Sequence, residues 1–289
     1  MKSRWKENVI ETMLVGTAST SILVVFLIFL FLGKEAFPFI NDPGLAELWK
    51  KRWVPVSFQK EIFGVIPLIT GSLVTTALAI SFLVPFGVIG ALFVAEFATS
   101  IEREILKPFI ELLAAIPSVI IGFWGLIFLG PLIKNLFGLQ SGLTALTGAF
   151  LLALMAIPTV LSISEDAIHS VPLSYKEASM ALGASSLQTA WRVTLPAALP
   201  GIIAAIMLGI GRVIGETMVV LMVTGNAAAI SFNPLESVRT MTATIAAEMG
   251  EVAFGSHHYQ ALFWVGIMLL IFTFGINMVA QRILRKSQI

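Results

Sequence analysis

An arginine and a glutamate lie one helical turn apart in the middle of an apolar segment that is long enough to cross a membrane. Arg212 and Glu216 interrupt residues 200–223, where nearly every other residue is apolar or small. A charged side chain at the bilayer centre costs at least ~2.5 kcal/mol on insertion scales, so such residues are usually paired, hydrated or functional. The i, i+4 spacing predicts that both side chains lie on one helix face, about 6 Å apart at Cβ.

In this pair, Arg212 is suited to bind an anion. The guanidinium of Arg212 is permanently charged and can form two parallel hydrogen bonds to an oxyanion. Gly209, Gly211 and Gly215 lie around the pair, so another helix or an aqueous pathway can approach this face closely. Two interpretations remain open: a substrate pathway that contains Arg212 and Glu216, or a structural ion pair that joins this helix to a neighbour.

The composition identifies an integral membrane protein. Of the 289 residues, 57% are hydrophobic and 12% are charged, and the mean hydropathy is +0.93. Soluble domains carry about 25% charged residues. The net charge of +1 gives no indication of a nucleic-acid partner. With no cysteine and three histidines, the sequence predicts no disulfide, no metal site and no cofactor.

About six segments are apolar enough to form transmembrane helices, because a helix needs about 20 apolar residues to cross the hydrocarbon. They are residues 13–32, 65–95, 108–132, 142–163, 200–223 and 261–283, and Pro117 is expected to break the third. The predicted fold is therefore all-α and membrane-spanning. We expect an N-terminal anchor helix and an external loop over residues 1–60, followed by one transmembrane domain over residues 61–289.

An even number of spans places both termini on the same side of the membrane. More Lys and Arg residues fall on the side of the termini than on the other side, and an excess of positive charge marks the cytoplasmic side. We therefore expect both termini in the cytoplasm, with Lys50, Lys51 and Arg52 outside. This basic cluster is interpreted either as a solvated loop surface or as a docking surface for an external partner.

Residues 164–199 form a long loop between the fourth and fifth spans. Ser174 followed by Glu177 predicts a capping box at the start of a short helix over residues 175–182. Gly183 suits the left-handed end of that helix. A second helix is expected over residues 185–193, and Pro196 and Pro200 are expected to stop it before the fifth span. Such a loop is either a rigid docking element or a plain amphipathic surface hairpin.

The spacing of residues in this loop resembles a known family motif. Glu177-Ala178-Ser179, Gly183, Val193 and Leu195-Pro196 resemble the EAA motif of the permeases of ABC importers, with Ser for the second Ala and Val for Ile as mild departures. The resemblance implies that the loop inserts into a cleft of a separate ATPase subunit. It assigns this coupling role to Glu177, Ala178, Gly183, Leu195 and Pro196.

Further segments of the sequence resemble one particular group of these permeases. Residues 211–218 and 222–226, together with residues 105–128 and 242–267, resemble the PstC-type permeases of phosphate-specific ABC importers from about Phe63 onward. Residues 34–59 carry no clear resemblance. The family implies a MetI-like permease core in the inner membrane, here with an extra N-terminal helix. It also implies three kinds of partner: a second, PstA-like permease, an ATPase dimer and an external phosphate-binding protein.

Two alternatives to a phosphate permease remain. The substrate could be another oxyanion (sulfate, molybdate or phosphonate), or the chain could be an ion-coupled secondary transporter that uses Arg212 and Glu216 as a relay. The EAA spacing argues against the second, because a secondary transporter needs no loop that docks an ATPase. The sequence contains no Gly-x-x-x-x-Gly-Lys-Ser/Thr motif. We therefore expect ATP hydrolysis on a partner subunit, so that this chain is not itself an enzyme.

Overall fold

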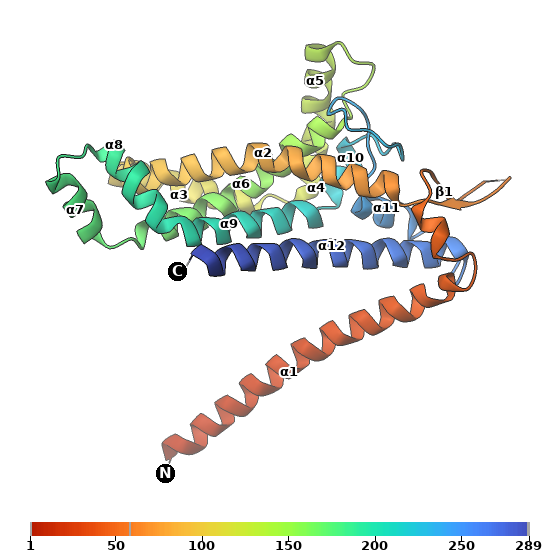
Figure 1. The fold of residues 1–289 in the computed structure, drawn as a ribbon, viewed down its shortest axis with the longest axis horizontal. Helices are drawn as coiled ribbons and strands as arrows, with labels where there is room; N and C mark the ends of the chain where they lie inside the picture. The colour runs from red at the N-terminus through yellow and green to blue at the C-terminus, as the bar shows by residue number, and fades with distance from the viewer. Residues whose placement is uncertain (1, 58, 288–289) are drawn as a thin grey trace.

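The computed structural model describes residues 2–57 and 59–287 and is built mainly of helices (Figure 1). Within this described part, six helical segments are long and apolar enough to cross a membrane: Ile10–Ile40, Ile66–Glu96, Ser118–Phe137, Ala145–His169, Ser186–Gly215 and His257–Met278. The predicted all-α membrane fold with about six spans is confirmed. The short β1 (Trp53–Val54) and β2 (Ile62–Phe63) pair antiparallel in the first long loop.

The helices follow one another in a simple order. Those of the first half are α1 (Lys2–Ala36), η1 (Phe37–Ile40), η2 (Leu45–Trp49), α2 (Ile66–Glu96), α3 (Ser100–Ala115), α4 (Ser118–Trp124), η3 (Gly125–Leu129) and α5 (Gly130–Phe137). Those of the second half are α6 (Ala145–His169), α7 (Leu173–Ala181), α8 (Ser186–Thr189), η4 (Ala190–Thr194), α9 (Leu195–Gly215), α10 (Met218–Val223), α11 (Met241–Glu248) and α12 (His257–Ser287).

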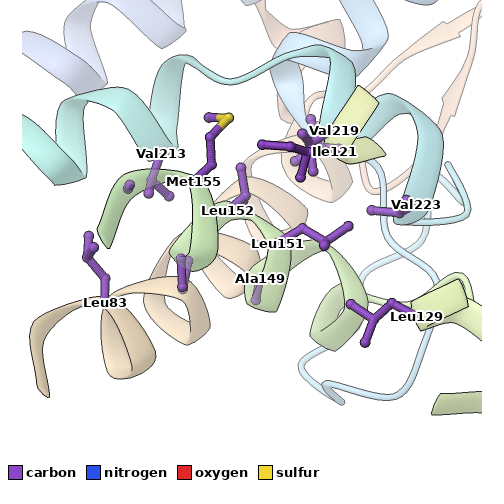
Figure 2. Close-up of a cluster of buried hydrophobic side chains, with 14 of the residues drawn as sticks. Leu83, Ile121, Leu129, Ala149, Leu151, Leu152, Met155, Val213, Val219 and Val223 are labelled. Carbon is purple, nitrogen blue, oxygen red and sulfur yellow. The ribbon is translucent and has the colours of Figure 1, made fainter. Parts of the chain in front are cut away.

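Helix α6 lies at the centre and packs against α2 on one side and α9 on the other (Figure 1). Glycines permit the close approach: a Cβ at Gly87 would lie 2.8 Å from Val160 Cγ1, and one at Gly209 would lie 2.4 Å from Val160 Cγ2. The buried apolar cluster between these helices and the short α4 and α10 includes Leu83, Leu152 and Val213 (Figure 2). This packing holds the residues just after Val213 at a fixed position in the bundle.

Helix α1 is the extra N-terminal helix. It contacts α12 near its C-terminal end, where the rings of Phe31 and Phe263 lie 5.6 Å apart and Trp264 Nε1 donates to Ala36 O at 2.8 Å. Its N-terminal end diverges from the bundle (Figure 1), and its apolar residues between Ile10 and Phe31 are exposed. Exposed apolar residues along a span are expected where lipid surrounds the helix.

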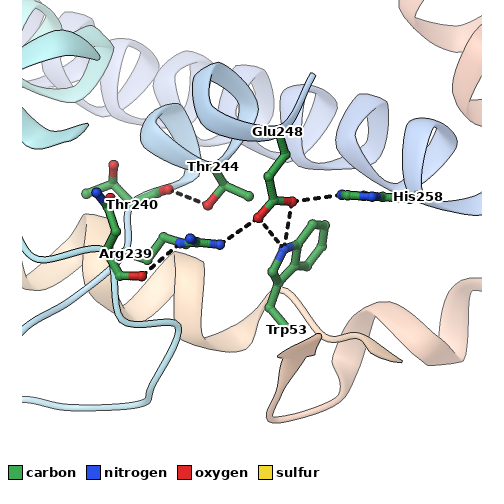
Figure 3. A network of polar contacts seen from close by, with 7 residues as sticks. Trp53, Arg239, Thr240, Thr244, Glu248 and His258 are labelled. Atoms are coloured by element: carbon green, nitrogen blue, oxygen red, sulfur yellow. Dashed lines mark hydrogen bonds and ion pairs between the residues drawn. The ribbon is translucent and has the colours of Figure 1, made fainter. Parts of the chain in front are cut away.

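The loop between α1 and α2 is fastened to the end of the bundle opposite α7 by a polar network (Figure 3). The carboxylate of Glu248 accepts hydrogen bonds from Trp53 Nε1 (3.0 Å) and Arg239 Nη1 (2.6 Å), and it lies 2.8 Å from His258 Nε2. Arg239 Nε also donates to the carbonyl oxygen of Asn226 at 3.0 Å. The network therefore joins the first loop, α11, α12 and the segment that follows α10.

Two predicted spans are placed differently by the structure. Helix α3 ends at Ala115 and α4 begins at Ser118, so the third apolar span is Ser118–Phe137 instead of residues 108–132. Ile116 is extended because Pro117 disfavours helical geometry at the residue before it. The fifth span is Ser186–Gly215 instead of residues 200–223.

The prediction that Pro196 and Pro200 stop the helix before the fifth span is wrong. The helix continues from α8 through the π-helical η4 into α9, with Pro196 in its first turn and Pro200 inside it. A π turn holds one extra residue and shifts the hydrogen-bond register. This shift gives a physical reason why Pro196, which lacks an N–H donor, does not end the helix directly after η4, whereas Pro200 lies in regular helix beyond it.

Candidate substrate pathway and coupling loop

The loop between α6 and α9 forms a compact turn of two short helices at one end of the bundle (Figure 1). Gly183 has φ +86°, as its predicted left-handed role requires. The predicted capping box of Ser174 and Glu177 is wrong: Pro172 precedes the first residue of α7 and no side chain caps it. Proline is favoured at a helix start because its φ is fixed, and this places Ser174 inside the first turn.

The outward surface of this loop is open. Glu177, Ala178 and Gly183 are exposed, and the side chain of Leu182 is 90% exposed. A cavity of about 500 Å³ opens between α7 and the helix that follows, lined by Tyr175, Ala178, Ser179, Leu182, Gly183, Ala184, Gln188, Arg192 and Val193. An exposed apolar residue beside a concavity is a feature that protein-binding surfaces share.

The inward side of α7 is attached to the bundle. Lys176 Nζ lies 2.5 Å from Glu96 Oε1 at the end of α2, and the hydroxyls of Ser179 and Thr189 lie 3.0 Å apart. Leu195 is partly buried against the apolar cluster at this end of the bundle, while Pro196 is exposed. The structure thus separates the five residues of the motif: three lie on the open surface, and Leu195 and Pro196 begin α9.

Arg212 lies in the last turn of α9 and is partly buried. Its Nη1 donates to Thr159 Oγ1 of α6 at 3.1 Å, and the described residues contain no ion pair of Arg212. A Cβ at Gly211 or Gly215 would meet nothing within 4 Å. The space beside Gly211 and Gly215 is therefore open, and the guanidinium, with one hydrogen bond to Thr159, keeps donors free for an anion.

Glu216 is placed differently from the prediction. Helix α9 ends at Gly215, and Glu216 is extended, with φ −71° and ψ 133°. Its Oε1 accepts hydrogen bonds from the backbone N–H groups of Met218 (3.0 Å) and Val219 (3.3 Å) at the start of α10. Arg212 and Glu216 therefore do not share one helix face. The break follows from Gly215, a poor helix former, and from a carboxylate that can satisfy the free donors of the next helix.

A cavity of about 10 Å³ beside Glu216, with room for about one water molecule, is rich in hydroxyl groups. Besides Glu216, its polar lining consists of Ser72, Thr75, Thr76, Thr240 and Thr242, from α2 and the start of α11. Thr242 Oγ1 donates to the carbonyl oxygen of Glu216 at 2.9 Å, and Thr75 Oγ1 donates to Gly71 O in its own helix. The sequence offers a weak signal for this site, namely hydroxyl residues in an apolar span, but nothing that pairs α2 with α11.

The turn after α10 contains two residues with positive φ, Gly225 and Asn226. Gly225 has φ +81°, and a Cβ there would lie 2.1 Å from Ser237 Oγ and 2.7 Å from Leu143 O. Asn226 also has a positive φ of 55°, and its Nδ2 donates to Leu221 O at 2.6 Å. Glycine and asparagine are the residues that adopt this conformation at least cost. The Gly225-Asn226 pair therefore fixes the path of the chain from α10 to α11.

Among the described residues, the six helices that are long and apolar enough to cross a membrane, one of them with Arg212 in its last turn, are the features of a multi-pass membrane protein. Residues 84–287 match the family described as binding-protein-dependent transport system inner membrane component. The chain belongs to this family.

Curated relatives match over most of the chain. A probable ABC transporter permease, YqgH of Bacillus subtilis, is 37% identical over 84% of this chain and 78% of the relative. The phosphate transport system permease protein PstC of Mesorhizobium japonicum is 34% identical over 93% of this chain and 88% of the relative.

Solved structures share the fold. A bacterial alginate ABC transporter, in complex with a periplasmic protein that holds an alginate pentasaccharide, aligns with a TM-score of 0.68 and 17% identity over 99% of this chain and 96% of its own. The inward-facing MetNI methionine ABC transporter aligns with a TM-score of 0.57 and 21% identity over 78% of this chain and 94% of its own. The predicted MetI-like core is thereby confirmed.

Proposed function

We propose that this chain is a permease subunit of an ATP-driven phosphate importer and forms half of the translocation pathway. The observation that carries the proposal is the match to phosphate transport permeases at 34% identity over 93% of the chain. An open arginine inside the membrane supports an oxyanion substrate, because its planar donors fit phosphate oxygens. A permease for sulfate, molybdate or phosphonate is the second candidate, since Arg212 alone suits any of these anions.

The loop around α7 couples the permease to ATP hydrolysis. The exposed Glu177, Ala178 and Gly183 form the surface that docks a separate ATPase dimer, and Leu195 and Pro196 lead from that surface into α9. The chain carries no phosphate-cradling ATP motif of its own, so hydrolysis takes place on the partner. The other partners are a second, PstA-like permease and an external phosphate-binding protein. Both termini and the α7 loop lie in the cytoplasm.

Uptake by cells tests the substrate. Phosphate-starved cells that lack this chain are given it back together with the genes for the ATPase, the second permease and the binding protein. The proposal predicts that uptake of labelled phosphate is restored, while uptake of labelled sulfate and molybdate is unchanged. Restored sulfate or molybdate uptake without restored phosphate uptake would favour the second candidate.

A further inference from the structure

The end of α2 next to the α7 loop carries a charge of the wrong sign for its position. Glu96 is the last residue of α2, where a carboxylate is disfavoured by the partial negative charge of the C-terminal carbonyl groups. Its partner is Lys176 of α7, with Nζ 2.5 Å from Glu96 Oε1. The two side chains are 16% and 13% exposed, so solvent screens this pair much less than a surface ion pair.

A second cation, Arg103, already binds the C-terminal carbonyl groups of α2. Arg103 of α3 donates from Nη2 to the carbonyl oxygens of Val94 (3.0 Å) and Ala95 (2.8 Å). Arg103 therefore supplies the favourable positive charge at this helix end. The end of α2 does not need Lys176 for that purpose, and the Glu96–Lys176 pair connects α2 to the α7 loop in addition.

The same helix end is held to α6 through α3. Glu165 of α6 is 6% exposed and lies 3.1 Å from Lys107 Nζ and 4.0 Å from Arg103 Nε. The hydrogen bond to Glu165 raises the pKa of Lys107, so Lys107 stays charged at neutral pH. The ends of α2, α3 and α6 thus form one charged assembly, and Lys176 is the residue that joins α7 to it.

The far half of α2 reaches the cavity beside Glu216. Ser72, Thr75 and Thr76 of α2 line that cavity, and α2 continues from there to Glu96 as one helix that contains Pro85. Twenty residues of helix span about 30 Å. Pro85 removes one backbone hydrogen bond from α2 without ending it, and α2 packs against α6, so a displacement applied at Glu96 can reach the cavity wall along one packed helix.

We propose that the Lys176–Glu96 ion pair is the connection through which movement of the ATPase-docking loop is transmitted to α2 and to the hydroxyl-lined cavity. Lys176 and Glu96 are then positioning residues for transport. This inference rests on the proposed function in that it needs an ATPase bound at α7. It adds to that function the particular contact that couples α7 to the hydroxyl-lined cavity beside Glu216.

The first experiment measures phosphate transported per ATP hydrolysed by the complete complex in proteoliposomes. Lys176→Met and Glu96→Gln should leave complex assembly and ATP hydrolysis near normal and lower the ratio about tenfold, the size expected for loss of one charge-assisted bond. The double variant Lys176→Glu with Glu96→Lys should restore the ratio. Lys34→Met, which removes a pair at 4.0 Å between the exposed Lys34 and Glu35 in the last turn of α1, is the control.

The second experiment does not depend on the transported anion. The chain contains no cysteine, so Thr76→Cys provides a single thiol in the cavity wall. Trapping the ATPase in its closed state should change the reaction rate of this thiol with a maleimide, and Lys176→Met should abolish the change. A change that persists in Lys176→Met overturns the inference. The inference is also overturned if Lys176→Met and Glu96→Gln lower transport and ATP hydrolysis by the same factor and the double variant Lys176→Glu with Glu96→Lys does not restore them. Absence of phosphate uptake by the unmodified complex counts against the proposed function instead, and the thiol result still decides the inference.

Discussion

At the scale of single residues, the sequence identified Arg212 but not the surroundings of Glu216. Apolar flanks predict an arginine in the middle of a membrane span, but the structure places Arg212 in the last turn of the span Ser186–Gly215, with one hydrogen bond to Thr159. The end of α9 at Gly215 depends on a local competition between helix continuation and the capping of α10. Thr159 and Thr242 are distant in sequence, and no spacing rule pairs them with Arg212 or Glu216.

Arg212→Lys should leave the chain folded in the membrane and remove most phosphate flux. Lysine keeps the charge but lacks the planar fork that binds two oxyanion oxygens at once. The measurement is labelled phosphate uptake by the reconstituted complex at equal amounts of inserted protein, with the exposed Arg52→Lys as control. Near-normal flux in Arg212→Lys would show that a simple positive charge suffices.

Glu216 has two interpretations that substitution separates. If its carboxylate mainly caps α10, Glu216→Gln keeps an acceptor oxygen for the N–H groups of Met218 and Val219. Glu216→Ala removes that acceptor and should destabilise the chain by about 0.5–2 kcal/mol, the usual cost of a lost cap. Thermal unfolding in detergent compares the two variants. Equal stabilities of the Gln and Ala variants would contradict the capping role. They would favour the second interpretation, in which the Glu216 carboxylate accepts a hydrogen bond from protonated phosphate that sulfate cannot donate.

At the scale of elements, the lengths of the apolar segments predicted how many membrane-spanning helices there are more accurately than they predicted where each helix ends. Four of the six spans lie close to their expected positions. The third and fifth are displaced by Pro117 and by the π turn of η4. Proline was correctly expected to interrupt the third span, yet Pro196 and Pro200 lie within a continuous helix. The register shift at η4 accounts for Pro196, which directly follows it, and the residue types alone do not report that shift.

Gly183 gives a test of the α7 loop as an element. Its φ of +86° is strained for a residue with a Cβ, while a Cβ there would meet nothing within 4 Å. Gly183→Val should therefore distort only the turn, because β-branched residues resist positive φ. The expected result is loss of ATPase co-purification or of coupled transport with membrane insertion intact. Gly183→Asn is the matched control, because asparagine tolerates this conformation. Normal uptake by the Gly183→Val variant would contradict the coupling role.

At the scale of the whole molecule, the orientation in the membrane remains a prediction from the distribution of Lys and Arg. Because the chain has no cysteine, single cysteines report it directly. Lys51→Cys in the first loop should react with a membrane-impermeant maleimide added outside intact cells, whereas Ser186→Cys at the start of α8 should react only after the membrane is permeabilised. Both positions are exposed. The reverse labelling pattern would place the α7 loop outside, where no cytoplasmic ATPase could reach it.

The central claim is that this chain forms a pathway for phosphate that an ATPase drives. The most direct measurement is accumulation of labelled phosphate in proteoliposomes that contain this chain, the second permease, the ATPase and the binding protein. We predict uptake with ATP, none with a non-hydrolysable ATP analogue, none when this chain is omitted, and no competition by excess sulfate. Phosphate uptake that proceeds without ATP hydrolysis and responds to an ion gradient, or ATP-driven uptake of sulfate but not phosphate, would contradict the account.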